Sequence, residues 1–108
     1  MAREILLIQT TVENETDAKA LARKLVEARC AACVQITPIT SVYHWEGQIE
    51  NGGEYRLDIK TSPDAEGLLL ATLMEAHPYD TPEILLFRPA ANAEYGQWAK
   101  EETSGRAG

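Results

Sequence analysis

The 108-residue sequence has few cysteines, few aromatic residues and fewer basic than acidic side chains. Its two cysteines are too few and too close in sequence to staple a fold, which fits a reducing compartment. Ten Lys+Arg against 17 Asp+Glu give a formal net charge of −7 without a basic cluster, which argues against binding to nucleic acid. With 44% hydrophobic and 25% charged residues, the composition is that of a globular domain rather than a disordered or collagen-like chain.

Long hydrophobic runs are also lacking. Apolar runs such as residues 5–8 and 84–87 are far shorter than the roughly 20 residues of a membrane helix. The N-terminus leads into the first run without the features of a signal peptide. We therefore expect a cytoplasmic protein without membrane contact. The length allows one hydrophobic core, so we predict a single domain over residues 1–108.

The first part of the chain predicts a strand followed by a helix. The unbroken apolar run of residues 5–8, ended by polar Gln9, is typical of a central strand buried on both faces. From Glu15 the apolar residues follow the spacing of an amphipathic helix. Asn14 or Thr16 can cap the start of this helix.

Two longer strands are predicted to form a hairpin. Residues 34–45 are rich in β-branched and aromatic side chains, and apolar and polar side chains alternate in residues 55–60. The turn is predicted at Glu46-Gly47. We interpret the glycine-containing residues 51–53 as a bulge or irregularity within the returning strand.

The second half predicts a helix, a strand and a further helix. Ser62-Pro63 can start the helix, its apolar spacing continues to residue 76, and His77-Pro78 ends it. Residues 83–87 predict a final buried strand, and residues 91–102 predict a C-terminal helix. The order β-α-β-β-α-β plus a helix predicts an α+β fold of the ferredoxin-like, split βαβ type with a long hairpin.

Cys30 and Cys33 have the C-x-x-C spacing of a dithiol redox pair or of half a zinc site. However, they fall where a helix ends and a strand begins, and no second cysteine pair completes a zinc site. Two interpretations stay open. The cysteines either fill the core as small apolar residues or take a soft-metal role.

His77 precedes residues 78–83, a loop in which two prolines restrict the backbone. Such a loop could hold an imidazole, a phenol and a carboxylate in fixed directions, or the histidine could simply cap the helix C-terminus. The sequence has no Ser-His-Asp order, glycine-rich phosphate loop or H-E-x-x-H motif, so we expect a protein that is not an enzyme.

The hairpin carries a group of large apolar side chains, Val42, Tyr43 and Trp45, that a chain of this length can hardly cover. A patch of this kind usually marks an interface. The alternative is that the C-terminal helix folds over it.

Several strings of residues occur in a specific order. They are Ala31-Ala32-Cys33-Val34, Thr40-Ser41-Val42-Tyr43, Trp45-Glu46-Gly47, Ile59-Lys60-Thr61 and His77-Pro78-Tyr79-Asp80-Thr81-Pro82-Glu83-Ile84, followed by Tyr95 and Trp98. In these strings, from about residue 5 to residue 98, the sequence resembles the CutA divalent-cation tolerance family.

This resemblance implies a ferredoxin-like subunit that assembles into a homotrimer through its long hairpin strands, similar in architecture to the PII signal proteins. It also implies a role in tolerance to divalent cations, copper especially, without an established enzymatic activity. The metal ligands that the resemblance implies are His77 and Cys33. Compared with copper-binding members, Gln9 and Ala76 stand where a cysteine and a second histidine can occur, and Cys30 stands where leucine is commoner.

Two functions follow from these observations. The first is a trimeric, non-enzymatic protein that binds copper or another divalent cation and contributes to metal homeostasis. The second is a PII-like signalling trimer that binds a small metabolite or a partner protein in clefts between subunits. The residues expected to line such a cleft are Lys60, Tyr79, Thr81, Glu83 and Trp98.

Overall fold

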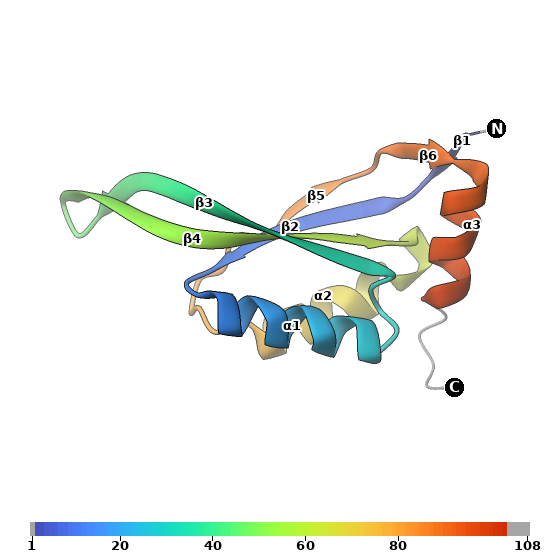
Figure 1. Ribbon diagram of the computed structural model, residues 1–108, viewed down its shortest axis with the longest axis horizontal. Helices are drawn as coiled ribbons and strands as arrows, with labels where there is room; N and C mark the ends of the chain where they lie inside the picture. Colours follow the sequence, from blue (N-terminus) through green and yellow to red (C-terminus); the bar gives the residue numbers. More distant parts are fainter. Residues whose placement is uncertain (1, 104–108) are drawn as a thin grey trace.

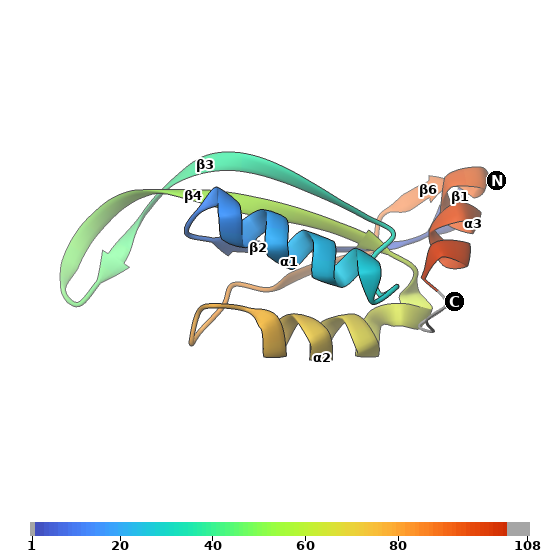
Figure 2. The same ribbon diagram turned by 60° about the horizontal axis from the view of Figure 1, so that its bottom comes forward.

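The computed structural model describes residues 2–103 as helices packed on an antiparallel sheet (Figure 1). The four-stranded sheet has the order β3-β4-β2-β5. Its strands are β2 (Leu6–Val12), β3 (Cys33–Trp45), β4 (Gln48–Thr61) and β5 (Leu85–Phe87). Helices α1 (Glu15–Glu27) and α2 (Glu66–Ala76) lie side by side on one face of this sheet (Figure 2). This order of elements confirms the predicted ferredoxin-like α+β fold.

The core lies between the sheet and the two helices. Successive side chains of a strand point to opposite faces, so Ile8 of β2 shares the helix-covered face with Ile59 of β4. The fully buried side chains of this core include Leu6, Ile8, Val12, Leu25, Leu57, Ile59, Leu69 and Leu73. The opposite face, called the open face below, carries Leu7, Gln9, Cys33, Asp58 and Lys60.

The prediction for the first strand is partly wrong. β2 is central, between β4 and β5, as predicted. However, Leu7 on its open face is only half-buried, and the strand does not end at Gln9 but continues to Val12. Ladder pairs from Gln9–Asp58 to Val12–Tyr55 extend the strand through its polar segment.

Local signals place both helix starts. The side chain of Asn14, and not that of Thr16, caps α1 by accepting a hydrogen bond from the Asp17 N–H at 2.8 Å. A short 3-10 helix, η1 (Pro63–Ala65), follows Ser62 and leads into α2, as the serine-proline pair predicts.

The predicted hairpin is present and extends well beyond the helices (Figure 1). Glu46 and Gly47 have φ values of 50° and 77°, so they form the predicted two-residue turn. The prediction of a bulge or irregularity at residues 51–53 is wrong, because β3 and β4 pair one to one from Cys33–Lys60 to Trp45–Gln48. Backbone pairing along both strands therefore holds the glycines in regular extended conformation. The hairpin contributes to the elongated shape of 47 × 28 × 20 Å.

The C-terminal part differs from the prediction in three ways. The last strand of the main sheet is restricted to β5, whose side chains are exposed at the sheet edge rather than buried. A two-stranded sheet of β1 (Ala2–Glu4) and β6 (Ala90–Asn92) was not predicted. Helix α3 (Ala93–Glu102) lies at the opposite end from the hairpin tip, so the alternative in which it covers Val42, Tyr43 and Trp45 is wrong (Figure 1). None of the helices within residues 2–103 is long and apolar enough to cross a membrane.

Candidate functional site

His77 lies directly after α2, and its ring contacts Thr10 on the helix-covered face of the sheet. Its Nε2 lies 2.9 Å from the Thr10 hydroxyl oxygen, and its Nδ1 accepts a hydrogen bond from the Tyr79 N–H at 3.1 Å. Because Nδ1 is the acceptor, the neutral ring carries its proton on Nε2 and donates it to Thr10. Burial lowers the pKa of His77, and the side chain is only 8% exposed. Both ring nitrogens are therefore already engaged within the chain.

His77 ends α2 through its backbone and holds the following loop through its side chain. Its backbone N–H donates to the Leu73 carbonyl at 2.9 Å and so ends α2. Its side chain also fixes the loop, because the ring accepts a hydrogen bond from the Tyr79 N–H and packs against the Tyr79 ring at a tilt of 58°, with 5.1 Å between centroids. The histidine is thus an anchor between α2, β2 and the loop.

Cys33 and His77 do not meet within one chain. Cys33 begins β3 opposite Lys60 on the open face, whereas His77 reaches Thr10 on the helix-covered face. The sheet separates the two side chains, so one ion cannot contact both. Residues 2–103 contain no group of three or more His, Cys, Asp or Glu side chains that could hold a metal ion. The cation implied by the resemblance therefore does not fit a site made by His77 and Cys33 of a single subunit.

The three other residues named in the metal prediction, Cys30, Gln9 and Ala76, are held in place by burial or by hydrogen bonds within the chain. Cys30 is fully buried, its Sγ donates to the Leu25 carbonyl at 3.4 Å, and burial raises its pKa, which supports the core interpretation. Gln9 lies on the open face and donates to Asp58 at 3.0 Å. Ala76 is half-buried at the end of α2.

The residues expected to line a ligand cleft fall into two separate groups. Tyr79, Thr81 and Glu83 lie in the loop between α2 and β5. Lys60 and Trp98 lie at the other end of the molecule, near α3. A single chain does not join these two groups.

The first group contains a hydrogen-bonded cluster that the sequence did not reveal. The Tyr79 hydroxyl donates to one oxygen of Glu54 at 3.0 Å, and the Ser41 hydroxyl donates to the other at 2.6 Å. Burial and then the Glu54 carboxylate raise the pKa of Tyr79, so its phenol stays protonated. This cluster ties the loop to both strands of the hairpin. No local sequence signal links Tyr79 to Glu54, because the contact spans 25 positions.

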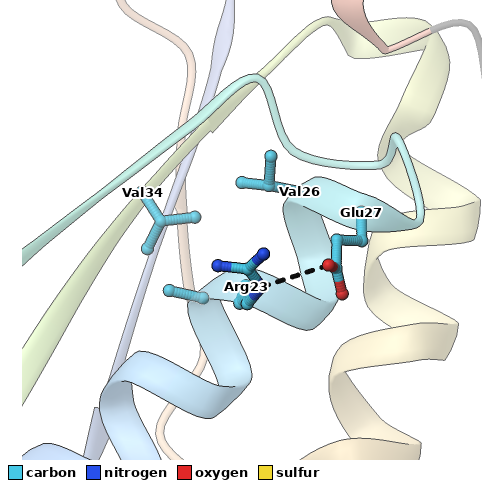
Figure 3. A pocket seen from close by; sticks show the side chains of 5 residues that line it. Arg23, Val26, Glu27 and Val34 are labelled. Atoms are coloured by element: carbon cyan, nitrogen blue, oxygen red, sulfur yellow. Dashed lines mark hydrogen bonds and ion pairs between the residues drawn. The ribbon is translucent and has the colours of Figure 1, made fainter.

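A shallow apolar groove of about 420 Å³ lies between α1 and β3 (Figure 3). Ala22, Val26 and Val34 contribute its apolar lining, and Arg23 and Glu27 form an ion pair at 3.1 Å beside it. None of the predicted site residues lines this groove.

The hairpin patch is exposed in the single chain. Val42, Tyr43 and Trp45 are 66%, 47% and 61% exposed. Ile49 on β4 and the side chains of β5 are exposed as well. The sheet thus presents large apolar side chains on the hairpin and at its β5 edge.

These features define a small ferredoxin-like α+β protein with a projecting hairpin and an anchored His-Pro-Tyr loop. A family model described as "CutA1 divalent ion tolerance protein" matches residues 6–102, and the chain belongs to this family.

Known relatives cover most of the chain. It is 41% identical over 102 residues to "Divalent-cation tolerance protein CutA" of Thermus thermophilus, covering 93% of this chain and 97% of the relative. It is 39% identical to human "Protein CutA", covering 86% of this chain and 53% of the human protein. The solved structure of CutA from Synechococcus elongatus superposes with a TM-score of 0.92 at 37% identity, covering 95% of this chain and 94% of that one.

Proposed function

We propose that this chain is a non-enzymatic, homotrimeric divalent-cation tolerance protein that binds copper or another divalent cation and contributes to metal homeostasis in the cytoplasm. The observation that carries this proposal is the family match over residues 6–102, together with relatives whose names state divalent-cation tolerance.

The trimer is supported by the two edges of the sheet. β3 and β5 are its edge strands, so each leaves one row of backbone groups without a strand partner in the sheet. The exposed apolar side chains lie on the hairpin and on β5. A contact that joins one edge to a different edge of the next copy is head-to-tail, and such contacts form a ring when the rotation between copies closes. We propose that three copies close this ring and bury Val42, Tyr43 and Trp45.

Cation binding then belongs to the assembled protein. His77 has no free ring nitrogen, and Cys33 lies on the other face of the sheet, so ligands from more than one subunit must complete a site. Each subunit carries a formal charge of −7, and a trimer therefore attracts cations to its surface.

Native mass spectrometry with and without Cu²⁺ tests both parts. We expect a species of three times the 11.9 kDa chain mass that takes up copper. Trp45→Glu should dissociate it and abolish copper uptake. The matched control Val26→Glu, at an apolar position 42% exposed on α1, should leave the trimer intact.

The outcomes separate assembly from cation binding. A wild-type monomer would refute the trimer. A trimer that takes up no Cu²⁺, Zn²⁺ or Ni²⁺ would refute the cation role. A monomeric Trp45→Glu variant with undiminished copper uptake would refute a site shared between subunits.

A further inference from the structure

Lys60 is a half-buried cation on the open face. Several basic side chains pair with acidic ones, for example Arg56 with Asp58 and Lys100 with Asp64. For Lys60, no carboxylate oxygen within residues 2–103 lies close enough to form an ion pair. An ammonium that is partly removed from water gains most from an anionic partner. In a chain with an excess of acidic residues, the missing partner points to an anion from outside.

One aromatic ring of α3 lies beside this ammonium, and a second ring packs against the first. The Lys60 Nζ lies 5.9 Å from the centroid of the Tyr95 ring, within the range of a cation–π contact. The Tyr95 and Trp98 rings are 5.5 Å apart at 40° and are held together by their i, i+3 spacing on the helix. Trp98 is 40% exposed, so part of its surface is free to contact another ring.

The polar groups of these three side chains, the Lys60 ammonium, the Tyr95 phenol and the Trp98 indole N–H, can all donate hydrogen bonds. Two of the three acidic side chains of α3, Glu101 and Glu102, have partners of their own. Gln97 donates to Glu101 at 3.1 Å, and Arg29 lies 3.5 Å from Glu102. The Lys60 ammonium lies on the Tyr95 ring, and the Tyr95 ring lies against Trp98, so the three side chains form one continuous cluster.

We propose that Lys60, Tyr95 and Trp98 form a binding site for a small planar aromatic monocarboxylate. The carboxylate pairs with the Lys60 ammonium, and the ring stacks on Trp98. A single negative charge is favoured over a polyphosphate, because the net charge of −7 repels polyanions.

Indole N–H resonances in an NMR titration provide a direct test on the purified protein in its native assembly. The chain has two tryptophans, so Trp45 serves as an internal control. Sodium 2-naphthoate should shift the Trp98 signal along a saturating curve and leave the Trp45 signal in place. The neutral 2-naphthalenemethanol tests the charge, cyclohexanecarboxylate tests the ring, and ATP tests the preference for a monoanion. Each should bind at least about tenfold more weakly than 2-naphthoate.

Substitutions of lysine identify the anion receptor. Lys60→Met should weaken 2-naphthoate binding about tenfold or more, while Lys60→Arg should retain it. Lys100→Met, on α3 itself, is the matched control and should bind like the wild type, with thermal melts confirming that each variant is folded. The proposal is overturned if 2-naphthoate produces no saturable shift at Trp98, if Lys60→Met binds normally, or if ATP binds more tightly than 2-naphthoate.

Discussion

Replacing His77 by alanine is expected to destabilise the protein by about 2–4 kcal/mol. The substitution leaves the fully buried Thr10 hydroxyl without its partner, which costs about 1–3 kcal/mol. It also removes the acceptor of the Tyr79 N–H and the packing of a side chain that is only 8% exposed. These losses separate an anchoring role for His77 from the role of a surface metal ligand.

Urea denaturation at a fixed protein concentration measures this change, because the unfolding of the proposed trimer depends on concentration. Thr10→Val is the companion variant, and the double-mutant cycle should give a coupling of about 1 kcal/mol between the two side chains. A loss below about 0.5 kcal/mol for His77→Ala, or the absence of coupling, would refute the reasoning.

The pH dependence gives a second measure of the same contact. Burial lowers the pKa of His77 below its ordinary value of 6.5, so at mildly acidic pH the unfolded chain binds a proton that the folded chain resists. The stability contributed by the neutral ring is complete above about pH 6.5 and decreases as the pH falls through that value toward the lowered, folded-state pKa. His77→Ala should therefore show a shallower loss of stability than the wild type between about pH 7 and pH 5. Parallel pH profiles would contradict the buried neutral histidine.

Three further predictions concern single contacts, each measured by urea denaturation. Asn14→Ala should cost about 1 kcal/mol, whereas Asn92→Ala, at a helix start without a side-chain capping bond, should cost a few tenths at most; equal losses would contradict the cap. Gly47→Ala should cost about 1 kcal/mol because of its φ of 77°, while Gly52→Ala, with open space around it and no left-handed φ, should be neutral; a neutral Gly47→Ala would exclude a strained turn. Tyr79→Phe should cost about 1 kcal/mol by removing the hydrogen bond to Glu54, and an unchanged stability would show that this bond contributes nothing.

Local signals predicted the elements that depend on neighbouring residues. The cap at Asn14 and the turn at Glu46-Gly47 involve groups only a few positions apart, so the sequence determines them directly. The end of β2 depends on a distant partner, because β4 supplies the pairs that continue the strand through Gln9. For the same reason the pairing of β1 with β6, which joins the two ends of the chain, left no local signal.

In the candidate site, too, features set by neighbouring residues were predictable and features set by distant partners were not. The His-Pro-Tyr loop was recognisable, because prolines and ring side chains lie within a few positions of His77. The partner of its ring, Thr10, lies 67 positions away. The separation of Cys33 from His77 depends on which sheet face each side chain uses, and this follows from strand register rather than from spacing along the chain.

The hairpin also has a consequence for the order of folding. All pairs between β3 and β4 lie within residues 33–60, so this ladder closes a short loop, and we expect it to form before the ladders that join β2 to β4 and β5. A hairpin that forms early exposes Tyr43 and Trp45 to solvent before the subunits of the proposed trimer can associate. Refolding yield should therefore fall at high chain concentration, where unfinished hairpins associate in the wrong register faster than complete subunits find one another.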